Sequence, residues 1–173
     1  MQILVTKGSQ ADWIEARRKD GSVARENLLH KGPVAHDLVH YVVETELGFD
    51  RAFWGLVAAG NAPESIAGMA KAAGHASAKR ADKPNPNFVE AIQVERIVES
   101  FEAELWSSGS DNGALRAMAE AGCDQSLVAT PSLSDEAIER TRARLAQLAE
   151  QWIALPVGGS LMLDWPERKH EAA

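Results

Sequence analysis

The sequence is poor in cysteine, with Cys123 as the only one among its 173 residues. A lone thiol cannot form an internal disulfide, which excludes a small scaffold held together by disulfides. Long apolar runs are missing too, because no stretch approaches the roughly 20 residues that cross a bilayer. The first residues also lack the basic segment and apolar stretch of a secretion signal. We therefore expect a cytoplasmic protein that does not enter a membrane.

Positive charge is also scarce in this chain. Lys and Arg number 18 against 25 Asp and Glu, which gives a formal net charge of −7 and a pI near 5.2. Proteins that grip nucleic acid through its phosphates need a basic surface, so this composition excludes nucleic acid as a general partner. The partner that remains is a small molecule or another protein, and the composition does not choose between them.

What the chain does have is the composition of an ordinary globular domain, with 45% hydrophobic and 25% charged residues. Its length suits a single domain over residues 1–173. We predict an α+β fold with strands over about residues 2–29, helices over about 34–155, and a final strand over about 160–165. The N-terminal hairpin and the C-terminal strand should form one small antiparallel sheet, packed on about five to six helices.

Turn residues and apolar periodicity locate these elements. Asp20-Gly21 favours a tight hairpin turn between two strand-like runs. The last long helix carries an apolar stripe that recurs every seven residues from Ile138 to Trp152. Thr141 interrupts the companion row, so we expect the stripe to pack within the chain. A monomer or a weak homodimer follows from this.

Two histidines one helical turn apart form the strongest candidate site. His36 and His40 lie on a predicted helix over about residues 34–47, at the border between its apolar and polar faces. A spacing of four residues places both imidazoles on one face, where their nitrogens can reach one ion. The sequence therefore predicts a divalent metal site with His36 and His40 as ligands, for which zinc is a suitable ion.

Two acidic residues of the same helix receive supporting roles. Glu44 lies about 12 Å of helix rise from His36, too far for the two to share an ion with His40. We expect Glu44 either to accept a hydrogen bond from His40 and orient its ring, or to act as a carboxylate on the side from which the site is approached. Asp37 takes the place of the glutamate base in the His-Glu-x-x-His metalloprotease pattern, with a side chain one methylene shorter. Asp37 is our candidate for a catalytic base or for a group that orients a ligand.

A third metal ligand has to come from outside this helix. The predicted long helix over about residues 88–106 offers three carboxylates that share a stripe with apolar residues, so they should be partly buried. Two other histidines lie elsewhere in the chain. The candidates are Glu95, Glu99, Glu102, His30 and His75.

The segment His36-Asp37-x-x-His40 resembles the HDxxH metal motif of the coenzyme Q biosynthesis proteins, a family that is all-helical and associated with zinc. The resemblance covers only this segment and the Leu47-Gly48 pair after it. It implies a zinc ion held by the two histidines. It does not extend to the strands that we expect at both ends of the chain.

The acidic ligand of that family does not carry over. It lies twelve positions after the second histidine, where this chain has Ala52. The longer segment over residues 31–44, Lys-Gly-Pro-x-x-His-Asp-Leu-Val-His-x-x-x-Glu, is similar to one carried by small bacterial proteins. That similarity implies no particular activity.

Two interpretations of the histidine pair are open. In the first, the protein binds a metal ion, and it is a metal-dependent hydrolase if the ion activates water and polarises a carbonyl or phosphoryl oxygen. In the second, it is a non-enzymatic interaction or accessory module whose histidines form hydrogen bonds at the edge of the core. Metal analysis of protein made without a histidine tag separates them, because only the first predicts about one equivalent of metal.

Overall fold

The computed structural model describes residues 1–29, 34–66 and 85–166. It confirms the predicted α+β class, since one antiparallel sheet is combined with five α-helices and a short 3-10 helix among the described residues. The strands are β1 (Gln2–Thr6), β2 (Ala11–Arg17), β3 (Val23–Leu29) and β4 (Ser160–Asp164). The helices are α1 (His36–Leu47), α2 (Phe53–Ala58), η1 (Pro86–Phe88, the 3-10 helix), α4 (Val89–Ser107), α5 (Asn112–Gln125) and α6 (Asp135–Ala154).

The four strands pair antiparallel in the order β3-β2-β1-β4. The C-terminal strand joins the N-terminal hairpin, as predicted, and aligns Leu163 with Ile3. At the turn between β2 and β3, Gly21 adopts a φ of 85°, and the amide of Ser22 donates to the Asp20 carboxylate at 2.9 Å. The positive φ explains why glycine occupies this turn.

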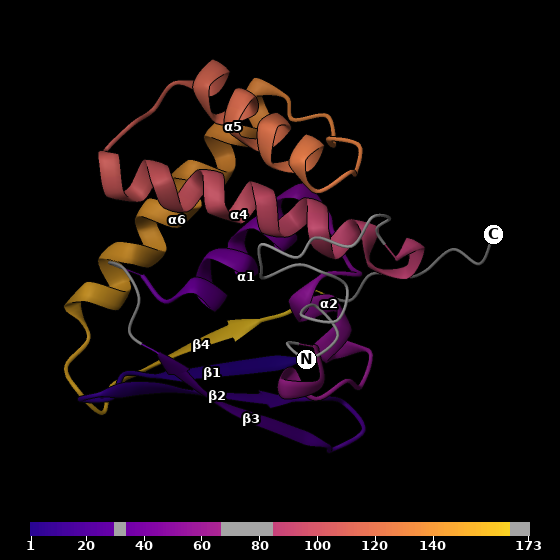
Figure 1. Ribbon diagram of the computed structural model, residues 1–173. Coiled ribbons are helices and arrows are strands. Elements are labelled where there is room, and N and C mark those ends of the chain that lie inside the picture. Colours follow the sequence, from indigo (N-terminus) through magenta and orange to yellow (C-terminus); the bar gives the residue numbers. More distant parts are fainter. Residues whose placement is uncertain (30–33, 67–84, 167–173) are drawn as a thin grey trace.

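The helices form layers on one side of the sheet (Figure 1). α1 lies over the sheet and contacts α2 and α6, α4 packs on the side of α1 away from the sheet, and α5 packs on α4. On the inner face of the sheet, Ile3, Val5 and Ile14 are buried. On the outer face, which no described helix covers, Trp13 is 55% exposed. The apolar core therefore lies between the sheet and α4, with α1 at its centre.

The central position of α1 determines where its polar residues lie. Leu38, Val39 and Val42 are completely buried. The Tyr41 hydroxyl donates to the Asp164 carbonyl of β4 at 3.0 Å, which joins α1 to the edge of the sheet. Because other helices cover the remaining sides of α1, its histidines and carboxylates lie at packed interfaces or at their edges.

A carboxylate caps the N-terminus of α5. The Asp111 carboxylate accepts hydrogen bonds from the amides of Gly113 and Ala114 at 2.7 and 3.1 Å. Such an N-cap satisfies backbone donors that have no partner within the helix. The same arrangement, with a carboxylate from a different helix, recurs at α2.

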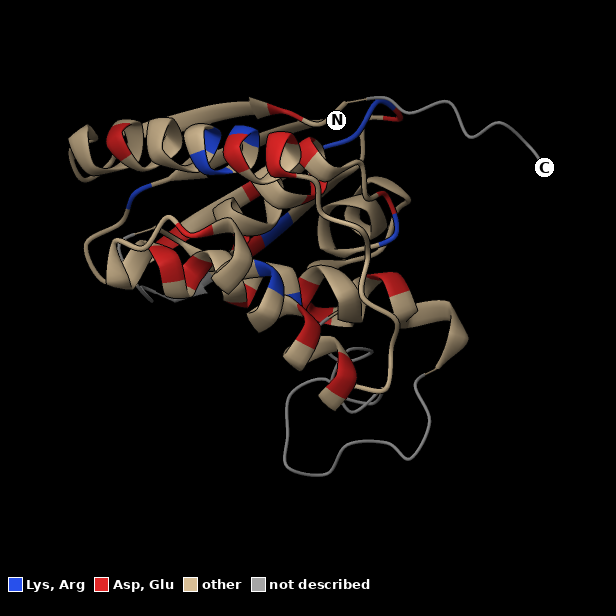
Figure 2. Ribbon diagram, turned by 90° about the horizontal axis from the view of Figure 1, so that it is seen from above, with Lys and Arg blue, Asp and Glu red and all other residues tan. Residues whose placement is uncertain are grey.

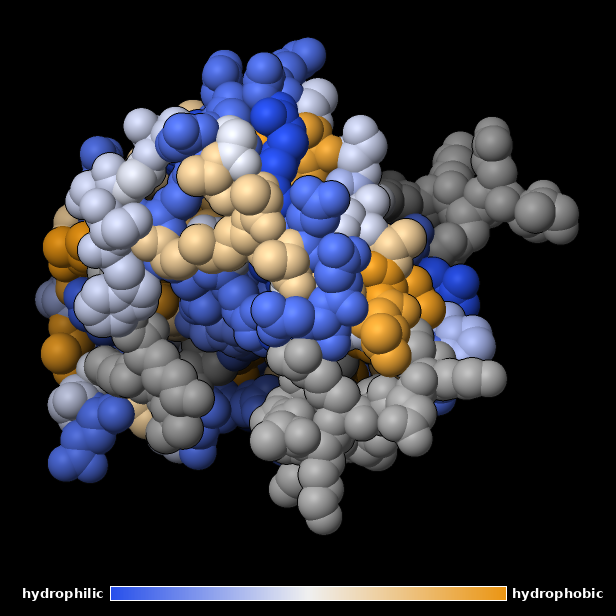
Figure 3. Space-filling model, turned by 45° about the horizontal axis from the view of Figure 1, so that its top comes forward, coloured by the Kyte–Doolittle hydropathy of each residue, from blue (hydrophilic) through white to orange (hydrophobic). Residues whose placement is uncertain are grey.

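The surface over α4 and α5 is largely hydrophilic (Figure 3). Acidic positions are more frequent than basic ones along the helices seen in Figure 2, in agreement with the net charge of −7. Within the described ranges, no helix combines the length and the apolar character needed to span a membrane. Residues 67–84, which belong to the predicted helical region, lie outside the described residues.

Candidate metal centre

His36 and His40 lie on the same face of α1, as their spacing predicts. Their ring centroids are 4.7 Å apart, and the rings meet edge to face. His40 is buried, whereas 34% of the His36 side chain is exposed. The pair therefore lies at the border between core and solvent, with His36 on the open side.

The packing of α4 on α1 brings one carboxylate in front of both imidazoles. Val94 and Ile97 of α4 are completely buried in the core, and Glu95 lies between them on the flank that faces the histidines. Glu95 Oε2 is 3.1 Å from His40 Nε2, and Glu95 Oε1 is 3.8 Å from His36 Nε2. The two Nε2 atoms therefore converge on the same carboxylate.

These three side chains have nearly the dimensions of a metal site. One ligand atom from each of His36, His40 and Glu95 lies within 4.8 Å of the other two. Donor atoms held about 2 Å from one ion lie roughly 3–4 Å apart, so small side-chain rotations bring all three into range. The packed helices α1 and α4 carry these three side chains, which limits how far they move.

The second nitrogen of each imidazole faces another carboxylate. His36 Nδ1 is 2.9 Å from Glu102 Oε1, and His40 Nδ1 is 3.2 Å from Glu44 Oε1. With Nδ1–H donating to these oxygens, loss of the Nε2 proton leaves a lone pair on the side of Glu95. Histidines that bind metal ions almost always donate their other N–H in this way. Both rings thus have the orientation that a metal site requires.

Glu44 is held by the start of α2 as well as by His40. It is completely buried, and its carboxylate accepts hydrogen bonds from the backbone amides of Trp54 at 3.0 Å and Gly55 at 3.2 Å. Burial raises the pKa of Glu44, while the hydrogen bonds from His40 and the two amides oppose that rise. The structure therefore places Glu44 against His40, as expected; that it orients a metal ligand stays a prediction.

The surrounding carboxylates favour the protonated form of both imidazoles. Burial alone lowers the pKa of His40, but the hydrogen bonds to Glu44 and Glu95 outweigh it and raise that pKa to about 10. Burial also acts to lower the pKa of His36, but the hydrogen bond to Glu102 and the charges of Glu95 and Glu102 together outweigh it, so that this pKa is raised as well. A metal ion would therefore compete with protons for these ring nitrogens.

Asp37, the candidate base, lies beside a further group of carboxylates. Burial raises the pKa of Asp37, and the charges of the neighbouring imidazoles oppose that rise. Burial also raises the pKa of Glu26 on β3 to about 7, with further contributions from the charges of Asp37 and Glu64. The main-chain carbonyl of Asp37 accepts the indole N–H of Trp54 at 2.7 Å, which joins the first turn of α1 to α2.

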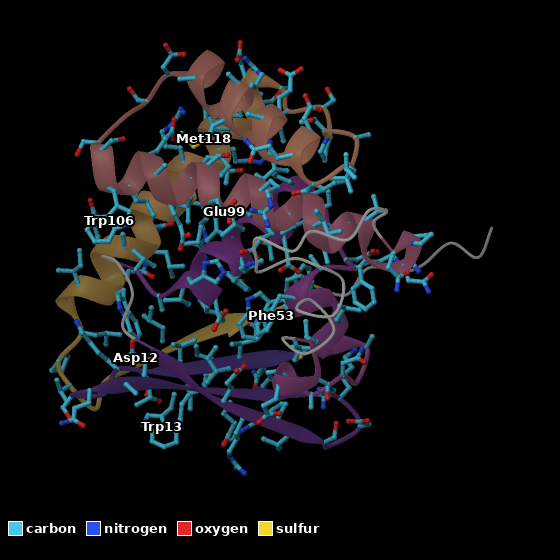
Figure 4. All side chains as sticks on the ribbon, in the orientation of Figure 1. Asp12, Trp13, Phe53, Glu99, Trp106 and Met118 are labelled. Carbon is cyan, nitrogen blue, oxygen red and sulfur yellow. The ribbon has the colours of Figure 1, made fainter. Side chains whose placement is uncertain are left out.

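The register of α4 against α1 separates the candidate third ligands. Glu95 faces both imidazoles, and Glu102 hydrogen-bonds to the more exposed one. Glu99, labelled on α4 in Figure 4, is not part of this group and pairs with Arg96 at 2.7 Å. The remaining candidates, His30 and His75, lie outside the described residues.

The position that the coenzyme Q biosynthesis motif marks for an acidic ligand has no such role here. Ala52 is completely buried just before α2, and Glu95 comes instead from a helix distant in sequence. No family model, curated protein or solved structure gives a match to this chain.

Proposed function

We propose that this protein binds a divalent transition-metal ion through His36 Nε2, His40 Nε2 and the Glu95 carboxylate. The observation that carries the proposal is the shared orientation of the two imidazoles, each with Nε2 toward Glu95 and Nδ1 toward a different carboxylate. This is the pattern by which proteins orient metal-binding histidines. Imidazole ligands favour zinc, iron and related ions over calcium and magnesium.

The proposed chemistry is metal-dependent hydrolysis. Three protein ligands leave coordination positions open, as in catalytic zinc sites. An ion held this way lowers the pKa of a coordinated water and polarises a carbonyl or phosphoryl oxygen. Access is from the side of His36, whose side chain is 34% exposed. Asp37, which follows His36 on α1, takes the role of base in this proposal, and Glu44 and Glu102 orient the ligands.

A second candidate function is an interaction or accessory module in which both histidines are structural. It is favoured by the contacts of His40, because a protonated ring there has a carboxylate at each nitrogen without any ion. The charged hydrogen bonds to Glu44 and Glu95 then serve only to hold α1 and α4 together. The two candidates differ in the metal content of the protein.

The metal content of untagged protein tests the proposal. After treatment with a chelator and dialysis against zinc, manganese or cobalt, we expect about one equivalent of bound metal and a raised melting temperature. His36→Ala, His40→Ala and Glu95→Ala should each lose most of the affinity. Glu99→Gln is the matched control and should keep it, because Glu99 lies one turn further along α4 and pairs with Arg96.

Parent protein that stays free of all three metals, with identical melting curves with and without zinc, would overturn the metal proposal. The structural role of the histidines would then stand.

A further inference from the structure

The first turn of α2 is part of the surroundings of the metal centre. The amides of Trp54 and Gly55 donate to the Glu44 carboxylate, which also faces His40 Nδ1. The indole of Trp54 donates to the carbonyl of Asp37, near the start of α1. α2 therefore hydrogen-bonds to α1 both before His40, at Asp37, and after it, at Glu44.

From these contacts we propose that Gly55 is a positioning residue of the metal centre. Through Glu44 it holds His40 in the tautomer and orientation that present Nε2 to the ion. The inference rests on the proposed function, because it concerns the orientation of a ligand in that same site. A carboxylate fixed by two backbone amides cannot follow a rotating ring, so it accepts from Nδ1 in one place only. Phe53 supports the same ring, with centroids 5.9 Å apart.

The fold leaves no room for a side chain at this position of α2. A Cβ built on Gly55 would lie 1.9 Å from the carbonyl oxygen of Asp50 and 2.2 Å from its carbonyl carbon. Both are backbone atoms, so a change of rotamer does not relieve the clash. The first turn of α2 would have to move away from Asp50 and would carry the two amides away from Glu44.

This arrangement also connects metal occupancy to the docking of α2. The ion fixes His40, which hydrogen-bonds to Glu44, which accepts from the amides of Trp54 and Gly55. By thermodynamic reciprocity, the ion stabilises the docked α2 by the same free energy with which docking stabilises the bound ion. Amide protection at α2 should therefore report metal binding.

Zinc affinity of two variants, measured by calorimetry on the full chain, tests the inference. Gly55→Ala displaces the amides, whereas Glu44→Gln keeps an oxygen for them but leaves His40 without its carboxylate acceptor. We expect each to weaken zinc binding about 10- to 100-fold. Melting curves recorded in chelator establish that each variant is folded.

The matched control is Gly113→Ala at the start of α5. This glycine also donates its amide to a carboxylate, that of Asp111. The nearest atom to a new Cβ there is the Asp111 carboxylate oxygen, at 3.1 Å, so a small shift of that side chain accommodates it. Zinc affinity should be unchanged in this variant.

Hydrogen exchange supplies a readout that a merely structural glycine would not move. When zinc is added to the parent protein, exchange of the Trp54 and Gly55 amides should slow several-fold. The amides of Gly113 and Ala114, which donate to Asp111, should exchange at the same rate as before.

The outcomes separate the two proposals. Parent protein that binds no zinc contradicts the proposed function and, with it, this inference. Parent protein that binds zinc while Gly55→Ala and Glu44→Gln bind it equally well, with unchanged exchange at α2, overturns the inference alone.

Discussion

Two polar clusters of this protein contrast in how their charges are matched. At the C-terminal end of α6, a single ammonium group meets backbone carbonyls: Lys7 Nζ donates to Trp152 and Leu155 at 3.0 Å and to Ile153 at 3.3 Å. An ammonium has three donors, and three acceptors take them. The Lys7 cluster is thus complete in itself and stabilises the end of a helix.

The cluster between α1 and α4 is of a different kind. Around two imidazoles the fold gathers three carboxylates, those of Glu44, Glu95 and Glu102. Glu102 and Glu44 hydrogen-bond to the Nδ1 atoms of His36 and His40. Glu95 lies close to both Nε2 atoms. In the Lys7 cluster the backbone carbonyls use every donor of the ammonium group, whereas the two Nε2 atoms point toward one shared carboxylate, and this orientation makes the second cluster the candidate site for an ion.

The largest expected effect is on zinc affinity. His36→Ala and His40→Ala should each weaken binding by about 100-fold or more, because neither imidazole alone holds the ion. The double variant should lose little beyond either single one, which is the signature of ligands that act together. Competition with a chromophoric chelator measures all three affinities. Losses that simply add would show instead that the two histidines act independently.

The pH dependence of the metal-free protein gives the next largest effect. The pKa of His40 is raised from 6.5 to about 10, so its protonated ring stabilises the fold fully below about pH 6.5, and this stabilisation is lost as the pH rises through 10. We expect the free energy of unfolding to fall by on the order of 3 kcal/mol between pH 7 and pH 10. Urea denaturation in chelator measures it. His40→Gln should lose most of that slope, and an unaltered slope would contradict the assignment.

Lys7→Met tests the Lys7 cluster at the end of α6. It removes the charged hydrogen bonds to the end of α6 but keeps an apolar stem near Trp152. We expect a loss of about 2 kcal/mol in the free energy of unfolding, equal with and without zinc. Zinc affinity should be unchanged. A matching loss of zinc affinity would mean that the two clusters are not independent.

Glu26→Gln should have the smallest effect, and it should stabilise the protein. The pKa of Glu26 is raised from 4.5 to about 7, so ionisation destabilises the fold increasingly between pH 4.5 and pH 7. At pH 8 the variant should gain about 1 kcal/mol, a figure reduced for solvent screening, and below pH 4.5 it should gain nothing. Glu15→Gln, which removes the partner of Arg25, is the control and should not stabilise. Equal gains at both pH values would contradict the explanation.

Local sequence patterns were sufficient for the sheet and for α1. Asp20-Gly21 does form the turn between β2 and β3, and the final strand does join the N-terminal hairpin. His36 and His40 share a face because helical periodicity is a property of adjacent residues. These predictions needed only interactions between near neighbours in the chain or the pairing of strand edges.

The choice among the candidates for a third ligand was beyond such reasoning. Glu95, Glu99 and Glu102 recur at similar spacing, so only the register of α4 against α1 decides which of them faces the histidines. That register depends on how buried side chains of two distant segments pack. The role proposed for Gly55 was equally hidden, because the close approach of the Asp50 backbone depends on the path of the loop before α2.

The distance along the chain between the proposed ligands has a consequence for stability. His40 and Glu95 are 55 residues apart. In the unfolded chain, bringing them to one ion means closing a loop of that length, at an entropic penalty of about 4 kcal/mol. The native fold already brings the two side chains together, so an ion bound as proposed would bind the native state selectively and would add its binding free energy to the stability of the fold. A bound ion would thus be a reversible cross-link within the chain, which a single cysteine cannot form.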